Sequence, residues 1–153
     1  MLLLLTSTRF GGILSQRPRS SENLKHFDGV IDHHKQTYDP VKSDLYVRAS
    51  KALKSGDAGS AETLYLRVIA RYPGDPDGYE ALGACLSFQE KDGEARTNYL
   101  HALDLNPQSV NALYGLGCVA YNLHRSVEAK DYLERALLVD QQNGLCHRVL
   151  GSV

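Results

Sequence analysis

A pattern of apolar and small residues recurs at intervals of about 34 residues along most of this 153-residue chain. The clearest copy lies at residues 76–109, and its first half places Tyr79, Leu82, Gly83 and Leu86 at intervals of three or four. Residues with that spacing lie on one face of an α-helix. The first half of the copy therefore predicts a helix with one apolar face.

The second half of the same copy predicts another helix. Ala95, Tyr99 and Ala102 again follow helical spacing, and Asn106-Pro107 comes directly after them. Proline cannot continue a helix interior, because it lacks a backbone N–H and its ring clashes with the preceding turn. Each copy is therefore expected to form a hairpin of two helices, whose small residues, with Gly83 among them, let the two backbones approach closely.

Matching residues occur one interval before and one interval after this copy. The copies have boundaries at 42–75, 76–109 and 110–143, and a partial copy follows at 144–153. After the clearest copy the matching residues are Leu113, Leu116, Gly117, Ala120, Ala129, Leu133 and Ala136. Before it they are Leu45, Ala49, Ala52, Ala61, Tyr65 and Val68, and the partial copy carries Leu150-Gly151.

The spacing and residue types of these copies resemble the tetratricopeptide repeat, a helix–turn–helix unit of about 34 residues. The resemblance covers residues 42–153. It implies an all-α fold, a right-handed superhelical stack (solenoid) of antiparallel helical hairpins. Helices are then expected at 43–55, 59–72, 77–90, 93–105, 111–123 and 127–139, with a partial seventh at 145–152.

Residues 1–41 precede the array and are expected to form a tail or linker, largely disordered or with a short helix. Residues 1–21 contain three arginines and no acidic residue, a composition typical of mitochondrial transit peptides. Gly11-Gly12 would break the amphipathic helix of such a peptide, so a disordered tail and a cytoplasmic location are favoured, with a mitochondrial location as the alternative. Asp39-Pro40 predicts a turn before the array.

Asp32-His33-His34 is similar to the metal-binding motif of the DHH phosphoesterases and provides the one enzymatic hypothesis. Such an enzyme needs further aspartates to hold divalent metal ions and activate water. The upstream aspartate motifs and the long α/β chain of that family are absent from this sequence. The motif is therefore interpreted as part of the linker, and no catalytic residue, metal or cofactor is expected.

Composition excludes other classes of function. The formal net charge is −1, and no basic cluster flanks the array, as a nucleic-acid interface would require. No stretch approaches the roughly 20 apolar residues of a membrane span. Cys85, Cys118 and Cys146 form no Cys-x-x-Cys pair and are expected to be small helical residues in a reducing compartment.

The resemblance implies a non-catalytic protein-interaction module, such as an adaptor, scaffold or assembly factor, that binds a peptide or helix in a concave groove lined by the first helix of each hairpin. Tyr46 and Tyr114 are expected to be exposed in the groove, whereas Phe88 and Tyr121 are equally consistent with packing between helices. The groove residues implied by the resemblance are Tyr46, Ser50, Asp77, Glu80, Ala84, Phe88, Asn111, Tyr114, Tyr121 and Arg148.

Some members of that family bind the C-terminal carboxylate of heat-shock chaperones through cationic and amide side chains. In this sequence the corresponding positions hold Tyr46, Ser50, Ala81, Asn111 and Gly115, and none is cationic. A carboxylate clamp requires charge-assisted donors. The sequence therefore predicts a different ligand chemistry at those positions.

The partial copy at 144–153 is more apolar than a terminal helix is expected to be. Leu145, Val149, Leu150 and Val153 dominate it, and an uncovered repeat end exposes apolar surface. Two outcomes are expected: self-association through this end of a truncated array, or a short helix that covers the helix at 127–139.

Overall fold

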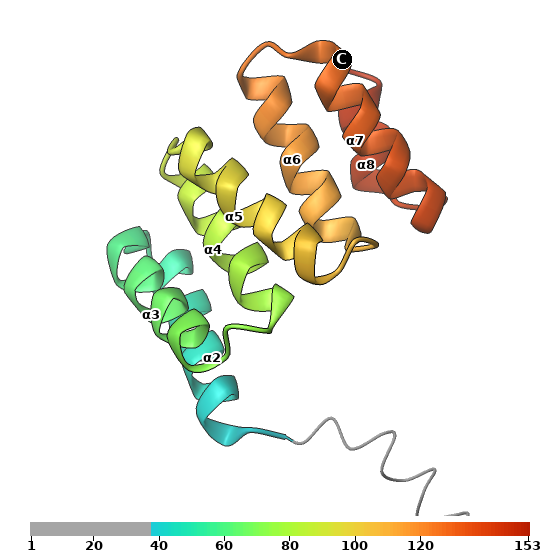
Figure 1. The fold of residues 1–153 in the computed structure, drawn as a ribbon. Coiled ribbons are helices and arrows are strands. Elements are labelled where there is room, and N and C mark those ends of the chain that lie inside the picture. The colour runs from blue at the N-terminus through green and yellow to red at the C-terminus, as the bar shows by residue number, and fades with distance from the viewer. Residues whose placement is uncertain (1–37) are drawn as a thin grey trace, which may run out of the picture. The chain divides into compact units, whose positions relative to one another are not determined.

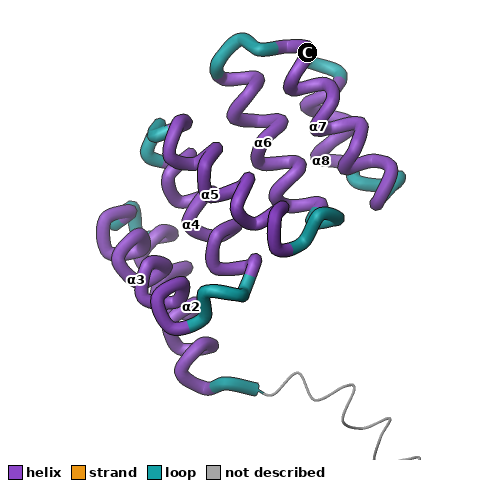
Figure 2. Tube along the Cα trace, in the orientation of Figure 1, coloured by secondary structure: helices purple, strands orange, loops and turns teal. Residues whose placement is uncertain are grey.

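The computed structural model describes residues 38–153, which contain seven α-helices and no β-strand. Figures 1 and 2 show these helices as successive hairpins. The helices are α2 (Pro40–Lys54), α3 (Ala58–Arg71), α4 (Pro76–Phe88), α5 (Asp92–Leu105), α6 (Val110–Asn122), α7 (Ser126–Val139) and α8 (Gly144–Leu150).

The helices pack in chain order. The pairs α2/α3, α4/α5 and α6/α7 form hairpins, and the second helix of each hairpin also contacts the first helix of the next. α8 takes the place of a fourth first helix, since it packs on α7 and also contacts α6. The structure therefore confirms the predicted all-α stack of antiparallel hairpins. We call α2, α4, α6 and α8 the first helices and α3, α5 and α7 the second helices.

The first helix begins earlier than the sequence predicted. Asp39-Pro40 was interpreted as a turn before the array, but Pro40 is the first residue of α2. The Asp39 carboxylate caps the helix, because its Oδ1 accepts hydrogen bonds from the backbone N–H groups of Val41 at 2.9 Å and Lys42 at 3.1 Å. Proline is favoured at a first helical position because its φ is already helical and no N–H partner is needed there. The prediction of a turn at Asp39-Pro40 was therefore wrong.

Two helices, α4 and α8, end two residues earlier than predicted. α4 ends at Phe88 and not at residue 90, because Glu90 adopts a left-handed backbone conformation with φ 60°. A residue of that kind terminates a helix. α8 ends at Leu150, two residues before the predicted end.

The core is built from the small and large residues of the repeated pattern. Ala61, Ala95 and Ala129 are fully buried at the same place in the three hairpins. Gly83, expected to let two backbones approach, instead makes room for a side chain: a Cβ atom at Gly83 would lie 2.9 Å from the Tyr99 ring. Gly115 of the next hairpin contacts the same ring even more closely, since its Cβ would lie 2.3 Å away. Tyr99 therefore holds α4, α5 and α6 together.

Salt bridges also link successive second helices. Lys91 Nζ lies 3.0 Å from Glu62 Oε2, joining the residue that precedes α5 to α3. Arg96 Nη2 of α5 lies 2.7 Å from Glu128 Oε1 of α7. The charged residue at this place in α3 and in α5 thus pairs with an opposite charge in the next hairpin.

Two sequence-based hypotheses concern residues outside the described part of the chain: the transit-peptide composition of residues 1–21 and the Asp32-His33-His34 motif. Between residues 38 and 153, no helix has both the length and the apolar composition needed to span a bilayer.

Candidate functional site

The ten residues proposed for a binding surface all lie on the first helices or their ends. We call them together the first-helix face. Seven of them are exposed and three, Tyr46, Glu80 and Tyr114, are half-buried.

Tyr46 is held by neighbouring groups. Its hydroxyl donates a hydrogen bond to Asp75 Oδ2 at 3.2 Å, and its ring packs against Tyr65 with ring centroids 6.0 Å apart. Lys42 Nζ lies 2.7 Å from the same Asp75 carboxylate. Burial and the neighbouring Asp75 raise the pKa of Tyr46, so this phenol stays neutral. Tyr46 thus connects α2 to the loop that precedes α4.

Glu80 makes the equivalent connection one repeat later. The Ser109 hydroxyl donates to Glu80 Oε1, and Asn111 Nδ2 donates to Glu80 Oε2 at 3.2 Å. Ser109 Oγ in turn accepts from the backbone N–H of Ala112 at 3.1 Å and caps α6. The Glu80 carboxylate is thus occupied by the next repeat, whereas the exposed Asp77 has no ion-pair partner within residues 38–153.

Tyr114, Cys118 and Arg148 form a polar cluster where α6 meets α8. A hydrogen bond to Cys118 and burial both raise the pKa of Tyr114. Burial likewise raises the pKa of the Cys118 thiol, while the positive charge of Arg148 acts in the opposite direction on both groups. None of the ion pairs formed among residues 38–153 involves Arg148. An exposed guanidinium beside two neutral donors is suited to a carboxylate ligand.

A pocket of about 300 Å³ adjoins this cluster and is lined by Cys118, Tyr121, Asn122, Arg148, Val149 and Ser152. Tyr121 is 42% exposed and Phe88 is 63% exposed. Both aromatic rings therefore offer open apolar surface.

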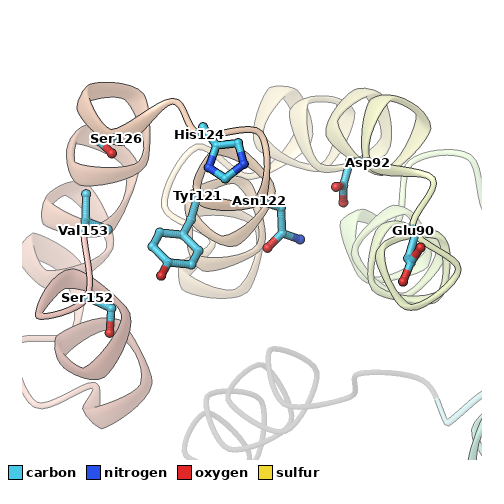
Figure 3. Close-up of a pocket in the computed structure, with 8 residues that line it drawn as sticks. All are labelled: Glu90, Asp92, Tyr121, Asn122, His124, Ser126, Ser152 and Val153. Atoms are coloured by element: carbon cyan, nitrogen blue, oxygen red, sulfur yellow. The ribbon is translucent and has the colours of Figure 1, made fainter.

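Figure 3 shows a second, larger pocket at the ends of the first helices. Its volume is about 710 Å³. Glu90, on the turn between α4 and α5, and Asp92, the first residue of α5, lie on one side, and Tyr121 and Asn122 lie at the end of α6. The remaining lining residues are His124, Ser126, Ser152 and Val153. Sequence reasoning missed the contribution of the turns, because the resemblance pointed only to positions within helices.

Tyr99 is another residue of this region that the sequence assigned to packing alone. Burial raises the pKa of Tyr99 to about 12, and Cys118, Glu80 and Tyr114 contribute to the same shift. These three residues belong to the first helices, and the Tyr99 ring lies against Gly83 of α4 and Gly115 of α6. The glycines at 83 and 115 were the available signal, because a side chain must occupy the space that they leave.

The arrangement is suited to binding and offers no obvious chemistry. In the part of the chain from residue 38 onwards, no group of three His, Cys, Asp or Glu side chains is placed to hold a metal ion. The three cysteines are free thiols, and burial raises the pKa of each, which disfavours the nucleophilic thiolate.

Comparison with known sequences identifies related repeats. A family profile described as "Tetratricopeptide repeat" matches residues 110–143. A TPR repeat-containing protein of Pseudomonas aeruginosa is 35% identical over 94 residues, which cover 61% of this chain and 16% of the relative. The chain thus spans a small part of that relative's length.

Comparison with solved structures gives the same fold. The first TPR of Spaghetti (RPAP3), bound to the HSP90 peptide SRMEEVD, has a TM-score of 0.69 at 22% identity, covering 72% of this chain and 88% of that one. The TPR domain of Sgt2 from Aspergillus fumigatus has a TM-score of 0.71 at 18% identity, covering 74% of this chain and 77% of that one. The TPR2B domain of yeast Sti1, in a complex with pHsp70, has a TM-score of 0.69 at 18% identity and covers 74% and 95%. The profile thus identifies residues 110–143 as a tetratricopeptide repeat, and the stacked hairpins have the fold of tetratricopeptide-repeat domains.

Proposed function

We propose that this chain is a non-catalytic protein-interaction module that binds an extended peptide on its first-helix face. The observation that carries the proposal is the cluster of Tyr114, Cys118 and Arg148 beside the pocket lined by Tyr121. It joins an exposed cation to open aromatic surface. Aromatic side chains provide large contact area at low entropic cost, and a guanidinium selects for carboxylates.

The charges that remain unpaired suggest how a ligand would lie. Asp77 on α4 and Arg148 on α8 are both exposed and take part in none of the ion pairs of the described residues. Glu80 is already occupied by Ser109 and Asn111. A ligand with an acidic group at Arg148 and a basic group near Asp77 would match both ends of the surface. Apolar side chains between them would contact Phe88 and Tyr121.

The similar structures support an interaction role of this general kind. Those of RPAP3 and Sti1 contain chaperone peptides or chaperone partners. The cationic clamp that the sequence lacks is replaced here by Arg148 in α8, so the ligand is proposed to differ from those peptides in register. Adaptor and scaffold roles are consistent with such a surface.

The proposal can be tested with a displayed library of random linear peptides selected on the full chain. Selected peptides are expected to share an acidic residue and at least one aromatic or large aliphatic residue. Binding of the most enriched peptide should fall about tenfold with Arg148→Glu, because a hydrogen bond to a charged group contributes about 1.5–3 kcal/mol.

Arg135→Glu is the matched control, since Arg135 is exposed on α7 and its ion-pair partner among residues 38–153 is Asp131 of the same helix. It makes the same charge change away from the first-helix face and should leave binding unchanged. Equal losses with both variants, or selected peptides that bind the Arg148→Glu chain normally, would contradict the proposal.

A further inference from the structure

The side of α8 that faces away from α7 offers a second surface, separate from the first-helix face. α8 has the same register as α4 and α6. Cys146 of α8 is fully buried, as are Gly78 of α4 and Ala112 of α6 at the equivalent place. This side of α8 packs against the preceding hairpin, just as the equivalent sides of α4 and α6 do.

The other side of α8 differs from α4 and α6 in what covers it. Leu82 and Leu116 are 4% and 1% exposed, and the second helix of each hairpin packs on the first helix that carries them. The equivalent Leu150 is half-buried and the following Gly151 is exposed. In residues 38–153, no second helix follows α8 to cover this side.

The glycine after each leucine shows how such a cover packs. A Cβ atom at Gly83 would lie 2.9 Å from the Tyr99 ring, and one at Gly117 would lie 2.7 Å from Leu133. Each glycine thus accommodates a large side chain of a second helix. A Cβ at Gly151 would meet only carbonyl oxygens of α8 itself, at 3.5 Å and 3.7 Å. Gly151 therefore leaves the same kind of space as Gly83 and Gly117, but no side chain of the described residues occupies it.

The charges indicate what kind of helix would pack on this side of α8. Glu62 of α3 pairs with Lys91 of the next hairpin, and Arg96 of α5 pairs with Glu128 of α7. Lys130 is the equivalent residue of α7. Its ion-pair partner among the described residues is Glu134 of the same helix, at 3.7 Å. An open pocket of about 530 Å³ lies beside it and is lined by Ser126, Val127, Lys130, Glu134, Leu150 and Val153.

We infer that the surface formed by Lys130, Leu150, Gly151 and Val153, here called the end face, binds an amphipathic helix with the side-chain order of α7. This helix carries an acidic residue that pairs with Lys130 and a small residue directly after that acid. Four positions after the small residue, a large apolar side chain packs on Gly151. A second small residue follows three positions after the large one. The second helix α7 shows this order in Glu128, Ala129, Leu133 and Ala136, and Arg96 pairs with its acid.

The chain itself supplies the probe. A labelled peptide with the sequence of residues 125–140, blocked at both ends, is titrated into the full chain and followed by fluorescence anisotropy. Saturable binding is expected. Gly151→Leu should weaken it at least about tenfold, because the added side chain fills the space required by the peptide's leucine. Gly144→Ala is the control on the same helix, since its added Cβ meets no neighbouring atom.

The charge pair gives an independent readout. A peptide with Glu128→Lys should bind up to about fivefold more weakly to the unmodified chain, as expected for a partly exposed ion pair. Its binding should recover on the Lys130→Glu chain. Circular dichroism and urea unfolding of each chain variant establish that it remains folded.

Three results would overturn the inference. The first is no saturable binding of the unmodified peptide. The second is binding that Gly151→Leu does not weaken. This result would be expected if the peptide displaced α7 from its own place on α6. The third is self-association of the full chain that Gly151→Leu abolishes and the peptide cannot displace, which would make a second copy the occupant.

Discussion

At the scale of single residues, the Tyr99 ring lies directly against the backbone of Gly83 and Gly115. Tyr99 is only 6% exposed, so its ring has no open space into which it can move. The two glycines belong to different hairpins, and the ring is therefore a structural link between repeats. The same contact joins α4 and α6, which carry Asp77, Glu80 and Tyr114 of the proposed binding surface.

Gly115→Ala should destabilise the chain. The added methyl group would lie 2.3 Å from the Tyr99 ring. Overpacking of this kind typically costs about 1–3 kcal/mol. The free energy of unfolding in urea should fall by about 2 kcal/mol. Gly93→Ala is the control, because its Cβ meets nothing within contact distance and helical alanine is favoured by about 0.5 kcal/mol. Equal stability of the two variants would mean that the ring is not held as described.

Glu90→Gly should stabilise the chain. Glu90 has φ 60° and His124 has φ 57°, and the equivalent residue of the first hairpin is Gly56 with φ 83°. The left-handed conformation costs a residue with a side chain roughly 1–2 kcal/mol, and glycine avoids this cost. Thermal or urea unfolding should show a gain of about 1 kcal/mol. The reverse change, Gly56→Ala, should cause a loss; a gain there would contradict this explanation.

At the scale of helices, salt bridges between successive hairpins supplement the apolar contacts. Hydrogen bonds from Gln89 and then Lys91 lower the pKa of Glu62, and a hydrogen bond from Arg96 lowers the pKa of Glu128. Both carboxylates thus bind protons less readily in the folded chain than in the unfolded chain. Their contribution is fully present above the ordinary pKa of about 4.5 and is lost as the pH falls through the lower folded value.

The double variant Glu62→Gln and Glu128→Gln should therefore be less stable than the parent near pH 7. On acidification its free energy of unfolding should fall by less than that of the parent. Urea unfolding midpoints measured from neutral pH to below pH 4.5 would show a flatter dependence than the parent. The two curves should converge at the acidic end, where the parent carboxylates are protonated as well. A constant difference at every pH would instead indicate loss of packing.

Most helices could be predicted from the sequence because their apolar spacing and the local stop signals agree. Pro107 follows α5, and Leu82-Gly83 recurs as Leu116-Gly117. The start of α2 could not be predicted, since Asp39-Pro40 is compatible both with a turn and with a capped first helical turn. The end of α4 depends on the backbone conformation of Glu90, and glutamate gives little indication of a left-handed φ.

The candidate site was less predictable than the helices. The repeat register placed Tyr46 and Glu80 on the first helices, yet each of them bonds to the residue that precedes the next first helix. Such contacts depend on the packing of one repeat on the next, which no single-helix pattern contains. The side chains of Tyr114, Cys118 and Arg148 likewise come together only when α8 packs beside α6.

At the scale of the whole molecule, the stack separates two tasks. The second helices and the buried alanines hold the hairpins together, while the first helices expose aromatic and charged groups on one surface. Solenoid stability arises mainly between neighbouring repeats, so substitutions of exposed first-helix residues should leave the fold intact. This separation is what allows the binding proposal to be tested by substitution.

The most direct test of the central proposal is amide hydrogen exchange of the full chain with and without the most enriched library peptide. The proposal predicts that added protection is concentrated in α4, α6 and α8, including the amides around Asp77, Tyr114 and Arg148. Little change is expected in α3 and in the exposed turns of α7. Protection concentrated in the second helices, or lost equally from the Arg148→Glu and Arg135→Glu chains, would contradict binding on the first-helix face.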